Sequence, residues 1–196
     1  MILFSPPIQL PKTIDDHADF LEKVESFQAN TISTSTPPEW TDQDAENSRK
    51  FLDSNDIRVG EFSTFHWGFD HQDASERNAA LEHYKRMIRH GVIMGAHCVG
   101  FSTYGDRGMP DMWSDSTWTR CLDAITRIAE EAENAKIDIA AHPHAMAPLC
   151  SVDRYVEMLT HVDSARLKVL IDIVNLTWPQ RIFNTTDLVN EVFDSL

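Results

Sequence analysis

The sequence predicts a parallel α/β fold, and three observations favour it. Apolar runs alternate with helical patterns along the whole chain, as they do in β/α proteins. The most apolar run, residues 167–174, lacks the period-two alternation of a half-buried strand and is typical of a strand covered on both faces. The expected strands begin near residues 31, 57, 97, 138 and 168, and the 26 to 41 residues between successive starts leave room for one crossover helix each.

The expected strands are short segments in which apolar or β-branched residues gather. Residues 31–36 are β-branched and stop at a Pro-Pro pair, while residues 57–65 are rich in Val, Ile and Phe. A loop with two glycines and a proline, residues 105–110, ends the third strand. The five strand segments are 31–36, 57–65, 97–103, 137–141 and 167–174.

Six further segments place apolar residues at helical spacing. In residues 114–134, for example, Leu122, Ile125 and Ala129 fall on one side of a helix. Thr41 and Asp44 resemble a capping pair, and Ser151 is expected to cap a later helix. The helical segments are 13–28, 41–54, 73–90, 114–134, 151–159 and 184–196.

Length, charge and cysteine content narrow the class of protein. The 196 residues fit one domain, residues 1–196, and fall short of the roughly 250 residues of a complete eight-fold β/α barrel. A net charge of −14 argues against nucleic acid as a partner. No apolar run approaches the about 18 residues of a membrane span, and the N-terminus lacks the basic start of a signal peptide. Three widely separated cysteines favour reduced thiols, and we therefore expect a cytoplasmic protein without a membrane partner.

Functional residues of parallel β/α folds lie where the strands end. Nucleotide-binding glycine motifs and the Gly-x-Ser-x-Gly elbow of hydrolases are absent from the sequence, so neither class gains support. The polar residues that follow the expected strands are therefore the candidates. They are His66, Trp67, Arg107, His142, His144, Asp172 and Asn175.

His142, His144 and Asp172 carry the strongest signal for a site. Residues two apart on a strand share a face, so the two imidazoles could bind one divalent metal; alternatively one of them packs and the other is solvated. Asp172 stands inside an apolar run, where a carboxylate is costly to bury without a partner, which favours a metal or substrate ligand. Asn175 could orient Asp172, contact substrate or cap the following turn.

The remaining candidates have a functional and a structural interpretation each. His66 and Trp67 could form the wall of a substrate pocket, or they could simply pack. Arg107 could hold an anionic group of a substrate, or lie on the surface.

Three stretches of sequence resemble the sugar phosphate isomerase/epimerase family with the xylose isomerase-like barrel. They are SERNAALEHYKRMIRHGVIMGAHCVGF, DSTWTRCLDAITRIAEEAENAKIDIA and IDIAAHPHAMAPLCSVDRYVEMLTHVDSARLKVLIDIVNL, and the resemblance extends over about residues 30 to 196. Arg77 at the start of a long helix and the run Ala132-Glu133-Asn134-Ala135 before a strand agree with the family pattern.

The resemblance implies a TIM barrel and proton transfer next to the carbonyl of a sugar or sugar phosphate. It also implies a divalent metal, Mn, Co, Zn or Mg, that polarises the carbonyl. Asp172 matches the family's ligand on strand six, and His144 matches the His of its Glu-Pro-His pattern. His142 stands where the family has a Glu that is both ligand and base. We therefore expect His142 and Asp172 to be catalytic and metal-binding, and His66, Trp67, Arg107, His144 and Asn175 to bind substrate.

The resemblance also implies an incomplete barrel of about six β/α units, because the chain ends before strands seven and eight. We expect any metal to be weakly bound, since two family ligands lie on those strands. Two alternatives stay open: an inactive or truncated homologue that keeps the fold, and a metal-dependent hydrolase that uses the His-x-His pair. Because unpaired sheet edges are usually covered, we also expect a homodimer or an edge covered by residues 1–11.

Overall fold

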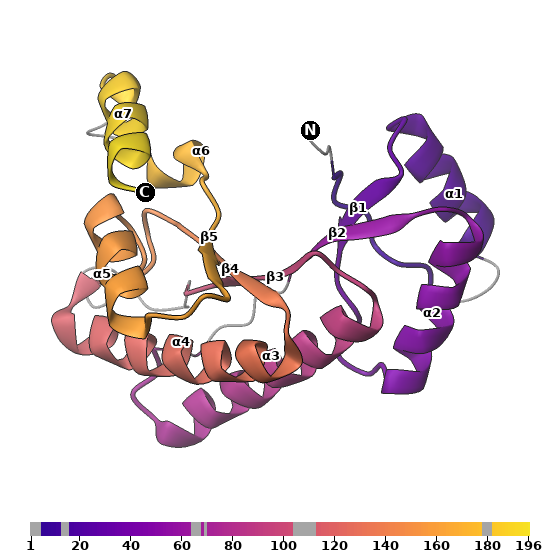
Figure 1. The fold of residues 1–196 in the computed structure, drawn as a ribbon, viewed down its shortest axis with the longest axis horizontal. Coiled ribbons are helices and arrows are strands. Elements are labelled where there is room, and N and C mark those ends of the chain that lie inside the picture. The colour runs from indigo at the N-terminus through magenta and orange to yellow at the C-terminus, as the bar shows by residue number, and fades with distance from the viewer. Residues whose placement is uncertain (1–4, 13–15, 64–67, 69, 104–112, 178–181) are drawn as a thin grey trace.

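The computed structural model describes residues 5–12, 16–63, 68, 70–103, 113–177 and 182–196. Within these ranges, one sheet of five parallel strands runs in sequence order, with each strand hydrogen-bonded to the next (Figure 1). Neighbours that follow sequence order in a parallel sheet are the arrangement of a β/α barrel, and the expected fold class is confirmed. The strands are β1 (Thr31–Thr34), β2 (Arg58–Ser63), β3 (Cys98–Ser102), β4 (Asp138–His142) and β5 (Leu167–Val169).

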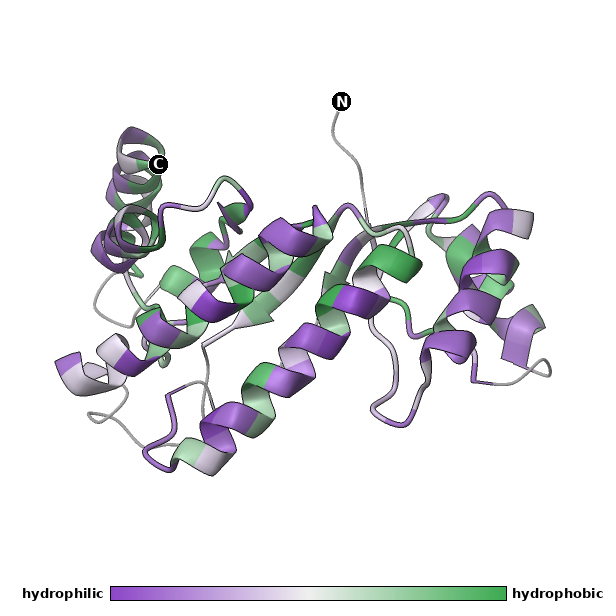
Figure 2. Ribbon diagram, turned by 60° about the horizontal axis from the view of Figure 1, so that its bottom comes forward, coloured by the Kyte–Doolittle hydropathy of each residue, from purple (hydrophilic) through white to green (hydrophobic). Residues whose placement is uncertain are grey.

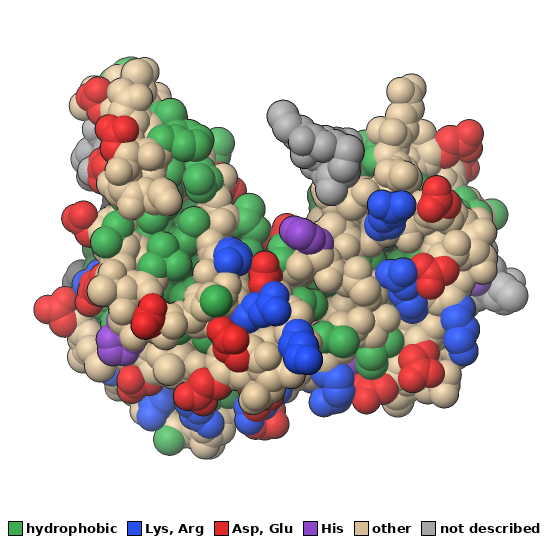
Figure 3. Space-filling model, viewed as in Figure 1, with side chains coloured by type: hydrophobic (Ala, Val, Ile, Leu, Met, Phe, Trp, Pro, Cys, Tyr) green, Lys and Arg blue, Asp and Glu red, His purple; other side chains and the backbone are tan. Residues whose placement is uncertain are grey.

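The helices lie around the outer side of this curved sheet, and α3 and α4 run beneath its middle (Figure 1). Among the described residues the five strands form an open sheet, and the space-filling view shows a hollow between the part of the molecule that carries β1 and α1 and the part that carries α7 (Figure 3). No helix in the described part of the chain has the length and apolar character needed to span a bilayer. The helices are α1 (His17–Ser26), α2 (Asp42–Ser54), α3 (Ala74–Ile93), α4 (Asp115–Ala135), α5 (Val152–Val162), α6 (Ile173–Leu176) and α7 (Thr185–Ser195).

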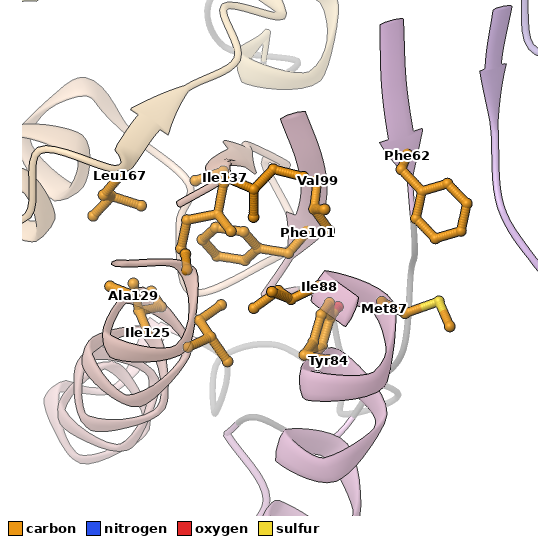
Figure 4. Close-up of a cluster of buried hydrophobic side chains, with 14 of the residues drawn as sticks. Phe62, Tyr84, Met87, Ile88, Val99, Phe101, Ile125, Ala129, Ile137 and Leu167 are labelled. Atoms are coloured by element: carbon orange, nitrogen blue, oxygen red, sulfur yellow. The ribbon is translucent and has the colours of Figure 1, made fainter. Parts of the chain in front are cut away.

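The core lies between the sheet and the apolar faces of α3 and α4. Figure 4 shows Val99 and Phe101 of β3 directed toward these helices. The rings of Phe101 and Tyr84 meet edge to face, with centroids 6.3 Å apart, and Ile125 of α4 is fully buried. Both helices are amphipathic, with hydrophilic residues on the outer face (Figure 2). Successive residues of a strand project from opposite faces of the sheet. Because Val99 and Phe101 face the helices, Gly100 between them faces the concave side.

The helix starts expected from the sequence are confirmed at two places. Thr41 and Asp44 form a reciprocal capping box, in which the Thr41 backbone N–H donates to the Asp44 carboxylate at 2.8 Å. The Ser151 hydroxyl accepts from the backbone N–H of Arg154 at 3.3 Å and caps α5. Each cap satisfies a backbone donor that the first helical turn leaves without a partner.

A segment before α1 covers the first edge of the sheet. The Ile8 N–H donates to the Ser33 carbonyl and the Ser33 N–H donates to the Pro6 carbonyl, both at 2.9 Å. Pro7 pairs with Ser33 in the parallel direction, so residues 6–8 occupy the place of a strand before β1. The expectation that the N-terminal segment covers an edge is confirmed for these residues.

Candidate functional site

The register of β1 and β2 turns an acidic side chain to the concave side of the sheet. Ile32 pairs with Val59 but Ser33 pairs with Glu61, so Gly60 is an extra residue in β2. Such a bulge reverses the side from which the following residues project. Glu61 thereby faces the concave side, beside Ser33, while Val59 before the bulge is buried with the core.

Glu61 reaches across the neighbouring strand to His142 at the end of β4. The Glu61 Oε1 and His142 Nε2 atoms are 2.5 Å apart, and the two side chains are 20% and 16% exposed. The strand between them, β3, contributes Gly100 at the crossing point. A Cβ atom at position 100 would collide with Glu61 Oε1 and lie 3.0 Å from His142 Nε2. The pair therefore depends on the absence of a side chain at this position of β3.

Two serines complete a polar network whose members come from β1, β2 and β4. Burial acts to raise the pKa of Glu61, but hydrogen bonds from His142, Ser63 and Ser33 outweigh it and hold that pKa below its ordinary value. The Ser33 and Ser63 hydroxyl oxygens are themselves 3.3 Å apart. Glu61 is thus ionised near neutral pH and can only accept hydrogen bonds, so the His142 Nε2 atom must carry the proton that it donates.

A cysteine adjoins this network without sharing its chemistry. Cys98 pairs in register with Glu61 on one side and Asp138 on the other. Burial, with the charges of these two carboxylates, raises the pKa of the Cys98 thiol to about 12. The thiol stays protonated near neutral pH and is therefore not a nucleophile.

The structure corrects the expected relation between His142 and His144. β4 ends at His142, so the two residues do not alternate on one strand and do not share its face. The His144 Nδ1 atom accepts the backbone N–H of Met146 at 3.0 Å, which turns the ring into its own loop. A Pro at position 143 favours this end, because its ring nitrogen has no proton to continue the ladder.

The structure also corrects the strand expected over residues 167–174. β5 stops at Val169, and Asp172 is the N-cap of the short helix α6, where its Oδ1 atom accepts the Asn175 N–H at 3.0 Å. The Tyr155 hydroxyl donates to the Leu170 carbonyl at 2.7 Å, so this carbonyl beyond β5 is bonded to a side chain. Burial and the Asp172 charge raise the pKa of Tyr155. Asn175 takes part in this turn through its backbone N–H, and the roles expected for its side chain stay predictions.

The loop after β4 and the turn after β5 are nevertheless neighbours. The Ala145 N–H donates to the Asn175 carbonyl at 2.7 Å, and the Trp113 indole N–H donates to the Ala145 carbonyl at 3.2 Å. Segments that carry His144 and Asp172 thus meet at the same end of the sheet as His142. His66, Trp67 and Arg107 lie outside the described residues.

Metal binding by His142 and Asp172 stays a prediction. Among the described residues, no group of three or more His, Cys, Asp or Glu side chains is arranged to hold a metal ion. The His142 Nε2 atom is used by Glu61, and one Asp172 oxygen is used by the cap of α6.

Sequence reasoning missed Glu61, although a signal for it was present. Glu61 is an acid inside an apolar strand segment, the same feature that singled out Asp172.

Comparison with known proteins establishes the family. A family model described as xylose isomerase-like TIM barrel matches residues 19–194. The chain therefore belongs to the xylose isomerase-like TIM barrel family, and the resemblance seen in the sequence is confirmed. No curated protein sequence matches the chain.

Solved structures share the fold at low sequence identity. A D-psicose 3-epimerase from Clostridium cellulolyticum, solved with D-tagatose, is 14% identical with a TM-score of 0.74, over 98% of this chain and 71% of that one. The 3-keto-D-glucoside 4-epimerase of E. coli is 10% identical with a TM-score of 0.73, over 94% and 76%. A Mycobacterium smegmatis protein of this barrel type, in complex with magnesium, is 14% identical with a TM-score of 0.74, over 100% and 74%. At these identities the likeness shows the fold.

Proposed function

We propose that the chain catalyses proton transfer next to the carbonyl of a sugar or sugar phosphate, as an isomerase or epimerase. The observation that carries this proposal is the Glu61–His142 pair at the strand ends of the concave face, 2.5 Å apart and partly exposed. Imidazole is the side chain most often used to take up and return a proton in catalysis. Epimerases among the structurally similar proteins support the choice of substrate class.

In the proposed reaction His142 removes a proton from the carbon beside the carbonyl. The electrons of the broken C–H bond form a carbon–carbon double bond, and the carbonyl oxygen becomes the oxygen of an enediolate. Return of a proton to the opposite face of the same carbon gives the epimer. Return of the proton to the former carbonyl carbon gives the isomer, with transfer of the hydroxyl proton of the first carbon to the enediolate oxygen, so that the new carbonyl forms on the first carbon. Asp172 is the second proposed proton carrier, since its segment borders the loop after β4. His66, Trp67, Arg107, His144 and Asn175 remain the proposed substrate contacts.

A divalent metal, when bound, would polarise the substrate carbonyl and stabilise the enediolate oxygen. The magnesium complex of a structurally similar protein motivates a test for it. His142 and Asp172 are the residues that would hold it, and the steps above are written for the side chains of this chain alone. A cytoplasmic location, which three free cysteines support, belongs to the same proposal.

Solvent exchange tests the proposed activity without knowledge of the particular sugar. The purified chain is incubated in D₂O with ketopentoses, ketohexoses and their phosphates, with and without added Mn²⁺, Co²⁺, Zn²⁺ or Mg²⁺. Proton NMR then measures loss of the signal of the proton beside the carbonyl. We expect exchange with at least one sugar and a loss of about a hundredfold in His142→Asn. His161→Asn, the same change at an exposed position on α5, is the matched control.

Two results would overturn the proposal. Absence of exchange with every sugar and every metal would favour the inactive homologue. Undiminished exchange in His142→Asn would place the chemistry elsewhere. Elemental analysis of the purified protein and of Asp172→Asn decides separately whether a metal is bound.

A further inference from the structure

We propose that Glu61, from two strands away, and Gly100, on the strand between, are positioning residues that fix the orientation and the protonated nitrogen of His142. The catalytic part of this inference rests on the proposed function. The structural part concerns the state of one imidazole and stands without it.

The first step is the direction of the hydrogen bond between the pair. Glu61 receives hydrogen bonds from His142, Ser63 and Ser33, and together they keep its carboxylate ionised against the effect of burial. An ionised carboxylate has no proton to donate. The bond of 2.5 Å therefore selects the His142 tautomer with the proton on Nε2. Because Nε2 already carries a proton, Nδ1 is the nitrogen at which His142 would take up the proton of the substrate, so Glu61 determines which ring nitrogen takes part in the reaction.

The second step is the route by which the carboxylate arrives. Glu61 on β2 and His142 on β4 are not neighbours in the sheet, because β3 lies between their strands. Glu61 pairs with Cys98 and His142 pairs with Ser102, so the two side chains meet over Gly100, which lies midway between those two positions of β3. A methyl group at position 100 would occupy the place of the Glu61 oxygen. Gly100 therefore acts through Glu61 on His142, and it does so by being small rather than flexible.

The third step separates this role from ordinary packing. Val99 and Phe101, the residues on either side of Gly100, belong to the core, whereas Gly100 faces the concave side. A glycine inside a strand weakens the strand relative to alanine. The cost is offset only if a close approach requires it, and the atoms that approach are those of the Glu61–His142 pair.

The tautomer of His142 is the direct measurement. Long-range ¹H–¹⁵N NMR of the full chain, with assignment from His142→Asn, distinguishes a proton on Nε2 from one on Nδ1. We expect the Nε2 proton in the native chain and a mixture of tautomers in Glu61→Gln and Gly100→Ala. Glu22→Gln, on the exposed face of α1, should leave the tautomer unchanged. A native ring protonated on Nδ1, or variants with the native tautomer, would overturn the inference.

A double-mutant cycle tests the role of Gly100 through stability. Gly100→Ala should disfavour folding strongly when Glu61 is present and weakly in the Glu61→Ala background, where the colliding oxygen is gone. We expect the two effects on the unfolding equilibrium constant to differ by about tenfold in urea titrations. Equal effects in both backgrounds would show that position 100 does not act through Glu61. If Gly100→Ala alone does not fold, rescue of folding by Glu61→Ala gives the same answer.

The two proposals fail in different ways. If no sugar exchanges its proton but the tautomer and the cycle behave as expected, the proposed function is wrong and the positioning is right. If exchange occurs and Glu61→Gln changes neither its rate nor the tautomer of His142, Glu61 does not position His142 for the reaction. The expected result is slower exchange together with the mixture of tautomers.

Discussion

The two edges of the sheet differ in how completely they are covered. At the first edge, residues 6–8 pair with β1, and Ile8 and Leu10 are each only 5% exposed. At the other edge, β5 is three residues long, and apolar side chains near it face solvent (Figure 3). Those that follow β5 include Ile171 at 40% exposure, Val174 at 81%, Phe183 at 93% and Phe193 at 68%.

This difference divides the candidate site into two halves. The half built by β1 to β4 is assembled, because the serines, Glu61 and His142 already hold one another. The half beyond β5 is not assembled in this way. Asp172 caps α6 instead of pairing with the other candidate side chains, and exposed apolar groups surround it. The covered edge therefore holds a preorganised pair of polar side chains, whereas apolar groups at the open edge stay in contact with solvent.

Truncation of Leu10 should have the largest effect, because it removes buried contacts at the covered edge. We expect Leu10→Ala to lower the free energy of unfolding by about 2–5 kcal/mol. Val174→Ala removes apolar atoms at the open edge, where the side chain is already 81% exposed. It should change the free energy of unfolding by less than about 0.5 kcal/mol. Urea titration measures both. Similar values for the two variants would mean that the edges do not differ in their contribution to the core.

Self-association should depend on the open edge. Exposed apolar groups around β5 and α7 offer a surface that a second copy of the chain could bury, whereas prolines 6 and 7 leave the first edge poor in donors. We expect a dimer, and Phe193→Asp should weaken it by at least about tenfold in dissociation constant. Phe27→Asp, on a side chain 47% exposed after α1, is the control. Light scattering that shows a monomer at all concentrations would contradict this prediction.

Local signals allowed most of the fold to be predicted. Every expected strand and helix overlaps an observed one, because periodicity and caps such as the Thr41–Asp44 box are properties of neighbouring residues. The end of β5 was beyond such reasoning. Apolar character favoured a strand through residue 174, but the Asp172 cap and the Tyr155 hydroxyl bind the backbone beyond Val169.

The candidate site was less predictable, because it depends on register between strands. His142 was identified at a strand end, yet its partner Glu61 comes from two strands away and faces it only because of the bulge at Gly60. The bulge breaks the period-two alternation between Val59 and Phe62, but that break does not tell which residue of a neighbouring strand Glu61 faces. The clearance at Gly100 is likewise visible only when three strands are placed side by side.

Helix caps provide a finer comparison between the two regions. Thr41 caps α2 through its side chain, whereas Asn184 at the start of α7 makes no such hydrogen bond. Thr41→Ala should therefore cost about 1 kcal/mol in the free energy of unfolding, and Asn184→Ala should cost clearly less. Urea titrations of the two variants check this order. An equal loss in both would show that the α7 cap forms in solution.

The smallest expected effect is the pH dependence that Glu61 contributes to stability. Burial raises the pKa of Glu61, and the hydrogen bonds from His142 and the serines lower it. Only the excess of the hydrogen bonds over burial lowers this pKa in the folded chain, so the effect on stability is small. A carboxyl group whose pKa is lowered by folding stabilises the folded state at pH values above its unfolded pKa, about 4.3. That contribution is lost as the pH falls from there through the lowered folded value.

Glu61→Gln lacks this titration, so the free energy of unfolding of the native chain minus that of the variant should shrink as the pH falls below about 4.3. The exposed carboxylates of Asp42, Asp44 and Asp73, whose pKa values are also lowered by their hydrogen bonds, are common to both proteins and cancel in this difference. Urea titrations between neutral pH and pH values below that point provide the measurement. A difference that stays constant would mean that folding does not shift the Glu61 pKa. A difference that grows would mean that burial outweighs the hydrogen bonds, and that the covered half of the site holds a strained carboxylate rather than a stabilised one.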